Sequence, residues 1–527
     1  MVILNFLLFI LVLGTIILVH EFGHFYFAKR AGILCHEFSI GMGPALWQKR
    51  KGETVYSVRG IPIGGYVAMA GESVSDAMIK IGQTVRLVTN DQGKVTRIVL
   101  HDDGEGVIGK VSGFDLYGKN LEPLHIDLEA DGTVTRYPVM RDAVYQFSEK
   151  REMWITPSEK SFESKTLWER FLVIFAGPFM NFVLALVLFL IVGFFVSKPD
   201  LDSNVIDSVS PGLPAETAGI VPGSMLVMIN DVDITDWNDI GETLSGLSSP
   251  VVDLTYMKNG TETTTQATLL VDVLVAGFSN YVLTDEGIET LVIHSDEPVI
   301  GVNSATRART DGNLLSGDVI TALEVGTARA DVSSWDDIIA FFRTHDRGDV
   351  TVTALRDGET VQGTYALISS DAVRRLGREP IGFTLGVAPE ADFDLLYSLA
   401  YPFESIYDNT MSVFMTIGLL ADRDEDLGFR DLAGPVGIFS LVSDTASQGI
   451  LAILGFTAFL SINIGLLNLL PIPALDGGRL VFLAIEGVSG RPLNRKVENI
   501  VNNAMFFLLL ALFVYVTFND IVRLVKG

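Results

Sequence analysis

Two histidines and a glutamate stand close together near the start of the chain, in the sequence His20-Glu21-Phe22-Gly23-His24. On an α-helix, four residues correspond to a rotation of about 400°, so His20 and His24 would lie one turn apart on the same face. Two imidazoles placed in this way can bind one Zn²⁺, and Glu21 can accept a proton from an attacking water. The spacing therefore predicts zinc-dependent hydrolysis.

The segment that leads into this motif is apolar. Residues 2–19 are interrupted only by Asn5, Gly14 and Thr15, and this length accounts for most of a membrane span. Charged and metal-binding side chains are costly inside a bilayer, so their presence there favours a functional role. No Lys or Arg precedes Lys29, which argues against a secretory signal peptide and for a retained span.

Four apolar segments are long enough to cross a bilayer, and we expect them at residues 1–28, 168–197, 450–478 and 500–523. Basic residues follow the first segment, precede the second, and separate the third from the fourth. Because basic residues favour the cytoplasmic side, these three regions are predicted to be cytoplasmic. The chain from about residue 198 to residue 430 would then lie outside the cytoplasm, and the histidine motif would lie near the cytoplasmic face.

Residues 395–445 form a further segment that is only partly apolar. Pro402, Glu404 and Asp408 interrupt its first half. This pattern indicates an interfacial helix followed by a linker, and a fifth span there would contradict the distribution of basic residues.

The composition is that of membrane spans joined to soluble domains, because 48% of the 527 residues are hydrophobic while 19% are charged. Residues 200–300 contain seventeen Asp or Glu and one basic residue, Lys258. Such an acidic surface repels phosphate, so we expect no nucleic-acid partner. Cys35 is the single cysteine of the sequence, which excludes an intrachain disulfide.

An internal repeat lies in the predicted extracytoplasmic region. The sequence PGSMLVMINDVDITDWNDI begins at Pro222, and SGDVITALEVGTARADVSSWDDI begins at Ser316. Both copies contain a short apolar strand, a turn and a Trp-x-Asp-Ile sequence, and both are followed by strands rich in Val and Thr. We therefore expect two similar units, at residues 200–296 and 297–392.

Two β-rich pieces are predicted on the cytoplasmic side, between the first two spans. Residues 36–72 contain short apolar runs and many glycines without helical periodicity, close to the end of the first span. Residues 75–160 contain alternating strands separated by turns, which is typical of a small soluble β-rich insert. The sequence assigns no function to this insert.

Two histidines need a third protein ligand to complete a catalytic zinc site. All other histidines except His36 lie in predicted soluble regions, so a third ligand at membrane depth is expected to be a carboxylate. Asp476 satisfies this requirement, because it lies at the cytoplasmic end of the third apolar segment, among two prolines and two glycines. An irregular backbone at that depth is tolerated only where protein or a cavity covers it.

Three residues that precede Asp476 suggest how a membrane-embedded peptide bond could be reached. Cleavage there requires the substrate helix to be opened locally, and the amide of Asn468, beside Pro471 and Pro473, could bind the freed backbone groups. Asn468 could equally form a hydrogen bond that packs helices together. Asn181 either approaches the site or bridges two helices, and residues 36–72 could accept a substrate as an additional β-strand.

Four sequences together resemble the site-2 protease family of intramembrane zinc metalloproteases, and within it the bacterial RseP-type members with tandem PDZ domains. They are HEFGH at His20, GPFMNF at Gly177, AGPVGI at Ala433 and LNLLPIPALDGG at Leu467. The expected fold is accordingly a polytopic α-helical membrane protein with four transmembrane helices, two extracytoplasmic α+β PDZ-like domains and a β-rich cytoplasmic insert. The insert at residues 75–160 is longer than the loop typical of Gram-negative members.

The resemblance also implies roles for individual residues. Zn²⁺ would be held by His20, His24 and Asp476, with Glu21 as the general base. Asn468, Pro471 and Pro473 would help to bind and open the substrate helix. Residues 36–72 resemble a membrane-reentrant β-loop.

The same resemblance implies a location and partners. The protein would lie in the bacterial inner or plasma membrane, in contact with lipid, and would cleave single-span proteins such as anti-sigma factors or signal-peptide remnants. Its PDZ-like domains would contact peptides or substrate ectodomains and exclude bulky ones.

Two other functions are consistent with parts of the sequence. A non-proteolytic PDZ membrane scaffold would bind peptides but would have no use for a general base. A membrane-tethered zinc protease acting on soluble substrates would not need its motif within an apolar span.

Overall fold

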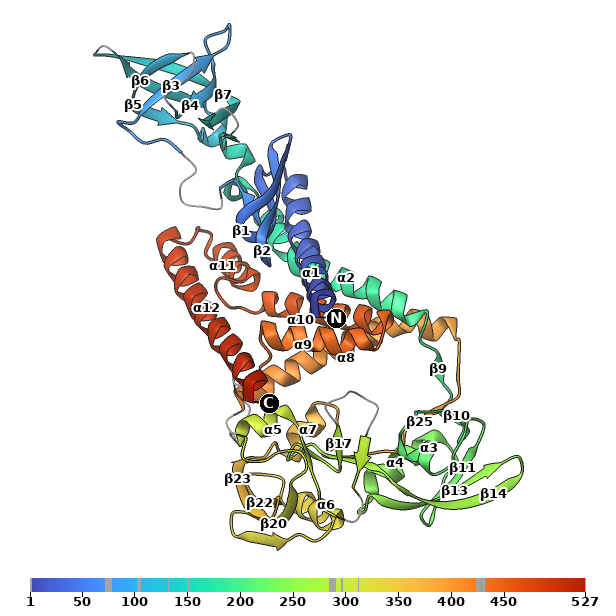
Figure 1. Cartoon of the computed structure of the whole chain (residues 1–527). Coiled ribbons are helices and arrows are strands. Elements are labelled where there is room, and N and C mark those ends of the chain that lie inside the picture. Colours follow the sequence, from blue (N-terminus) through green and yellow to red (C-terminus); the bar gives the residue numbers. More distant parts are fainter. Residues whose placement is uncertain are drawn as a thin grey trace. The chain divides into compact units, whose positions relative to one another are not determined.

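The computed structural model describes residues 2–71, 78–101, 106–130, 132–148, 151–283, 291–294, 297–310, 312–422, 428 and 432–526. The predicted boundaries at residues 1, 72, 75 and 296 lie outside these ranges. The chain divides into two compact units (Figure 1). The first contains residues 1–189 and 442–511, and the second contains residues 190–441 and 512–527.

Within the described ranges, four helices are long and apolar enough to cross a membrane. They are α1 (Val2–Arg30), α2 (Leu167–Gly193), α10 (Ile450–Leu469) and α12 (Arg495–Lys526). These four helices occupy the parts of the chain where the sequence predicted spans. The segment predicted to be interfacial contains α8 (Leu395–Ala421) and α9 (Pro435–Ser447).

The third predicted span is shorter than expected, because residues 450–478 do not form one helix. α10 ends at Leu469, and Asp476 begins a separate helix, α11 (Asp476–Ser489). Pro471 and Pro473 lack the backbone N–H that a continuing helix needs, and Ala474 has a φ angle of 72°. The irregular turn between the two helices places Asp476 at a helix start.

A buried carboxylate near the end of α12 holds the start of α9. Asp520, which is 4% exposed, accepts hydrogen bonds from the backbone N–H groups of Gly434 (3.2 Å) and Gly437 (2.9 Å). The first N–H groups of a helix have no intrahelical partner and attract negative charge. A Cβ on Gly434 would lie 2.7 Å from the Asp520 carboxylate, which gives the AGPVGI sequence at Ala433 a structural role.

Strands β1 (Cys35–Lys51) and β2 (Thr54–Met69) form an antiparallel hairpin that folds back on itself. Phe38 pairs with Tyr56 on one side and with Val67 on the other, so the first half of β1 lies between the two halves of β2. The rings of Phe25, on α1, and Phe38 pack with their centroids 5.1 Å apart. The hairpin is thereby held against the helix that carries the histidine motif.

The insert between this hairpin and α2 is a small barrel. Its strands are β3 (Thr84–Thr89), β4 (Val95–Val99), β5 (Val107–Asp115), β6 (His125–Ala130), β7 (Thr133–Ser148) and β8 (Arg151–Trp154). They are ordered β4-β3-β5-β6-β7-β8, and a parallel pairing of β4 with β7 closes the sheet. Leu87, Ile98, Ile126 and Leu128 are buried inside it.

The two repeats contain four-stranded antiparallel sheets with the same connectivity (Figure 1). The first is ordered β12-β11-β13-β14, from Val232–Asp233, Met225–Ile229, Val251–Lys258 and Thr261–Thr268. The second is ordered β21-β20-β22-β23, from Ala328–Asp331, Val319–Val325, Asp349–Arg356 and Glu359–Ala366. In each repeat a helix begins at the Trp of the Trp-x-Asp-Ile sequence, namely α4 (Trp237–Gly246) and α6 (Trp335–Thr344).

The repeats are interleaved, which differs from the predicted division between residues 296 and 297. β15 (Leu270–Val273) pairs with β24 (Ile381–Thr384), and both strands contribute to the core of the second repeat. β25 (Val387–Pro389) returns to pair with β10 (Ile206–Val209) of the first repeat. The second repeat is therefore inserted into the first, because the chain that leaves β14 enters the second core directly.

Candidate metal centre

Three side chains from distant parts of the sequence converge at one point. Nε2 of His20 lies 3.2 Å from Nε2 of His24. Oδ2 of Asp476 lies 3.2 Å from the former and 3.3 Å from the latter. His20 and His24 are buried, at 9% and 8% exposed, and Asp476 is half-buried. The three ligand atoms thus form a nearly equilateral triangle in a site from which most water is excluded.

The protonation of His24 is fixed by its hydrogen bond. Its Nδ1 lies 2.8 Å from the backbone carbonyl oxygen of Val173 on α2. A carbonyl oxygen can only accept, so Nδ1 carries the proton and the lone pair of Nε2 points toward His20 and Asp476. This is the arrangement that metal-binding histidines show, with one nitrogen donating to an outer partner.

The triangle has the dimensions of a zinc site. Ligand atoms about 2.0–2.1 Å from a tetrahedral Zn²⁺ are about 3.3 Å from one another. Two imidazole lone pairs and a carboxylate oxygen at this separation repel each other unless a cation lies between them. Two histidines and one carboxylate are also a donor set that catalytic zinc sites use, with the fourth position left for water or substrate. The three residues therefore fit Zn²⁺.

α1 and α2 approach closely at the site, and small residues make this possible. A Cβ on Gly177 would collide with Nε2 of His24, and a Cβ on Gly23 would collide with the carbonyl oxygen of Ala176. The His24 ring thus lies directly on the backbone of α2 at Gly177. Gly177 is a site residue that the sequence alone does not predict, although Val173, Gly177 and Asn181 recur every four residues and so share one helix face.

Asn181 lies next to His20 and also joins α2 to α10. It is fully buried, and its Nδ2 is 3.4 Å from Nδ1 of His20. Its Oδ1 is buried and has no hydrogen-bond partner among the described residues. The hydroxyl of Ser461 on α10 donates to the backbone carbonyl of Asn181 at 2.8 Å, so α2 is tied to α10 at the same point.

Glu21 lies beside the second half of β2. A Cβ on Gly65 would lie 2.8 Å from Cγ of Glu21 and 2.8 Å from the carbonyl oxygen of Ser39. Residues 65–69 of β2 pair with β1 on one side, and no other described strand pairs with them on the other. A strand edge with unpaired backbone groups therefore passes the carboxylate of the motif.

Asn468, Pro471 and Pro473 lie in and just after the last turn of α10, in the turn that leads to Asp476. Asn468 and Pro473 are half-buried, and Pro471 is exposed. Their predicted roles toward a substrate stay predictions.

Comparison with known proteins assigns this architecture to a family. Residues 8–512 match the model of peptidase family M50. The chain is 30% identical over 521 residues to the zinc metalloprotease RasP of Shouchella clausii, covering 98% of this chain and 99% of the relative. It is 30% identical over 516 residues to the zinc metalloprotease RasP of Geobacillus kaustophilus, covering 97% and 96%.

A third relative has a name that refers to regulation. The chain is 28% identical over 526 residues to the regulator of sigma-W protease RasP of Bacillus subtilis, covering 98% of both chains. These full-length matches confirm the predicted resemblance to site-2 proteases, the zinc dependence and the bacterial membrane location. The chain belongs to peptidase family M50 and is a zinc metalloprotease.

Proposed function

We propose that this protein hydrolyses peptide bonds within the transmembrane segments of single-span proteins, with His20, His24 and Asp476 as zinc ligands and Glu21 as the general base. The observation that carries the proposal is the triangle of ligand atoms, 3.2 to 3.3 Å on each side, at the end of an apolar helix. A protease for soluble substrates would not need its metal ligands at the end of an apolar, membrane-spanning helix, where such polar groups are costly.

When bound, Zn²⁺ supplies Lewis acidity, which polarises the scissile carbonyl and makes water a stronger nucleophile. The carboxylate of Glu21 accepts a proton from the attacking water and then delivers it to the leaving amide nitrogen. The buried positions of His20 and His24 exclude bulk water, so that charge developing on the carbonyl oxygen is stabilised in a medium of low polarity.

Asn181 orients His20 in this proposal. Rotation of its amide by 180° places Oδ1 against Nδ1 of His20, so the buried oxygen accepts the imidazole proton. Nε2 of His20 then presents its lone pair to the metal, as Nε2 of His24 does through Val173. The two histidines are thus held in the same tautomer by partners on one face of α2.

The substrate binds as an added strand along residues 65–69 of β2. An opened transmembrane helix has free backbone N–H and C=O groups, and a strand edge can satisfy them. This edge passes Glu21, so a peptide bond bound there is within reach of the base. Asn468 binds freed backbone groups of the same segment, and Pro471 and Pro473 keep the nearby turn from pairing with it.

The two repeats act as PDZ-like domains outside the cytoplasm and exclude substrates with bulky ectodomains. Anti-sigma factors and signal-peptide remnants are the substrate classes that fit a site of this kind, and the name of the Bacillus subtilis relative refers to sigma-W.

The test is co-expression with a tagged single-span substrate that lacks its ectodomain, comparing the wild type with Glu21→Gln by immunoblot. We expect a shorter product in the wild type and a loss of at least about a hundredfold in the variant, the usual contribution of a general base. Zinc content measured on the purified proteins should be equal. No product from several such substrates would favour the scaffold function, and equal product from both proteins would exclude Glu21 as the base.

A further inference from the structure

One face of α2 contacts every element that carries a metal ligand. Arg170, Val173, Gly177 and Asn181 are spaced by three, four and four residues, so they lie along the same side of the helix. Asn181 contacts His20, while Val173 and Gly177 contact His24. The remaining member of the row, Arg170, forms its hydrogen bond and ion pair with Glu486 on α11, the helix that begins with Asp476.

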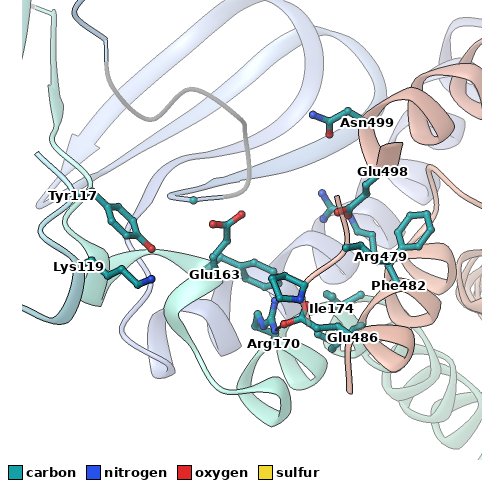
Figure 2. A pocket seen from close by; sticks show the side chains of 15 residues that line it. Tyr117, Lys119, Glu163, Arg170, Ile174, Arg479, Phe482, Glu486, Glu498 and Asn499 are labelled. Carbon is teal, nitrogen blue, oxygen red and sulfur yellow. Dashed lines mark hydrogen bonds and ion pairs between the residues drawn. The ribbon is translucent and has the colours of Figure 1, made fainter. Parts of the chain in front are cut away.

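Arg170 and Glu486 form the contact between these helices. Nη2 of Arg170 lies 2.5 Å from Oε1 of Glu486, and the two side chains are 12% and 22% exposed. Figure 2 shows both residues at the foot of a cavity of about 460 Å³, next to Ile174. The two charges are partly withdrawn from water, so the pair holds the two helices in one relative position more firmly than a fully exposed pair would.

We propose that the Arg170–Glu486 ion pair positions Asp476 for metal binding by fixing the direction of α11 relative to α2. This inference rests on the proposed ligand set. Glu486 lies ten residues after Asp476, which on an α-helix is a distance of about 15 Å. Arg170 is a positioning residue, because it acts on the metal site through a helix and does not contact the ligands.

The position of Asp476 depends strongly on the direction of α11, which the Arg170–Glu486 ion pair fixes. A rotation of α11 by about 5° about its far end would move Asp476 by roughly 1.3 Å over that length. Metal sites tolerate deviations of only about 0.2 Å in ligand distance. A second contact restrains the near end of the turn, because the backbone N–H of Ala474 donates to Oδ1 of Asn502 on α12 at 3.1 Å. The two contacts together define both position and direction.

Other charged groups surround the pair and matter for the choice of variants. Lys119, Glu163, Arg479 and Glu498 line the same cavity (Figure 2). These four groups carry two positive and two negative charges, so the cavity around the pair has no excess of either sign to favour one orientation of the exchanged pair.

The experiment measures the zinc affinity of the full-length protein in detergent, by competition with a chromogenic chelator, and the melting temperature with and without zinc. The variants are Arg170→Lys, Glu486→Gln, and the double exchange Arg170→Glu with Glu486→Arg. Lys119→Ala is the matched control, because it removes a cation from the same cavity. We expect each single variant to weaken zinc binding by up to about tenfold, the lower end of what the loss of a partner in direct contact with a ligand costs, because this pair acts on Asp476 through the helix. The double exchange should recover most of this loss.

The two melting temperatures separate positioning from packing. Zinc binding stabilises the folded state in proportion to the logarithm of its affinity. If the ion pair positions Asp476, the melting temperatures of a variant with and without zinc should therefore lie closer together than those of the wild type. A role limited to packing would lower both temperatures equally, leave the zinc affinity within twofold, and overturn the proposal. Asp476→Ala tests the ligand set separately from the role of the ion pair. Unchanged zinc affinity in that variant would contradict the proposal that Asp476 is a ligand.

Discussion

Carboxylates have structural roles both at the metal centre and at the helix starts of the two repeats. The two regions differ in how far the partners of each carboxylate lie from it in the sequence. At the metal centre, Asp476 meets His20 and His24 from the opposite end of the chain. At the starts of α4 and α6, Asp239 and Asp337 bind backbone groups within four residues of themselves.

This difference determines what a substitution should do. A local contact forms as soon as its helix forms, so its loss affects one helix end. A contact between distant segments depends on the packing of several helices, so its loss should affect all the ligands that the packing holds. We therefore expect the largest effects on zinc binding and cleavage from small changes on α2, and the smallest from changes at the repeat helices.

The largest effect on zinc binding is expected from Gly177→Ala. The added Cβ would collide with Nε2 of His24, the atom that faces His20 and Asp476, so the ring must move away. Zinc affinity should fall by at least about a hundredfold, the upper end of what losing an outer-shell partner costs. Zinc content after dialysis against a weak chelator measures this. Gly14→Ala on α1 is the control, because a Cβ there would meet no heavy atom within 4 Å apart from the neighbouring backbone of its own helix. Equal zinc loss in both variants would contradict the proposed contact between Gly177 and His24.

A smaller effect is expected from Asn181→Leu. Leucine fills the buried volume but cannot accept a proton from His20, so zinc affinity should fall about tenfold. Asn181→Asp keeps an acceptor oxygen and should retain more affinity than the leucine variant. Chelator competition on both proteins ranks them. The opposite ranking would show that Asn181 packs helices together and does not orient His20.

The same contrast explains what the sequence could predict. The spacing of His20 and His24 is local, and the need for a carboxylate at membrane depth was enough to select Asp476. The packing of Gly177 against His24 could not be predicted, because it depends on which faces of α1 and α2 meet.

Two predicted boundaries failed for a related reason. The end of α10 at Leu469 depends on the turn that Pro471 and Pro473 form, and apolar content alone does not reveal it. The interleaving of the repeats depends on β25 returning to β10 across the whole second repeat, a pairing with no local signal.

The two tryptophans of the Trp-x-Asp-Ile sequences test whether the same local sequence contributes the same stability in both repeats. Trp335 is fully buried and its Nε1 donates to the carbonyl of Val299 at 3.3 Å, whereas Trp237 is half-buried. Trp335→Ala should destabilise the second repeat by about 3–5 kcal/mol, and Trp237→Ala should cost less. Hydrogen exchange of the repeat peptides in the full-length protein measures this. Neither variant should change cleavage of a substrate without an ectodomain, and a large loss there would couple the repeats to the metal centre.

The smallest effect is expected at the start of α6, as a function of pH. Hydrogen bonds from the backbone N–H and hydroxyl of Ser333, both 2.8 Å long, hold the pKa of Asp337 below its ordinary value. Because the folded pKa is the lower one, this stabilisation is complete above the unfolded pKa of about 3.9 and is lost as the pH falls through the folded pKa. Asp337→Asn should therefore weaken protection of α6 against hydrogen exchange by at most about 1 kcal/mol at pH 7, with the difference from wild type shrinking below pH 4. Asp239→Asn, at the start of α4, should leave α6 unchanged. A difference in α6 that persisted at low pH would mean that the charge of Asp337 does not contribute, and that the contact stabilises the helix through its hydrogen-bond geometry alone.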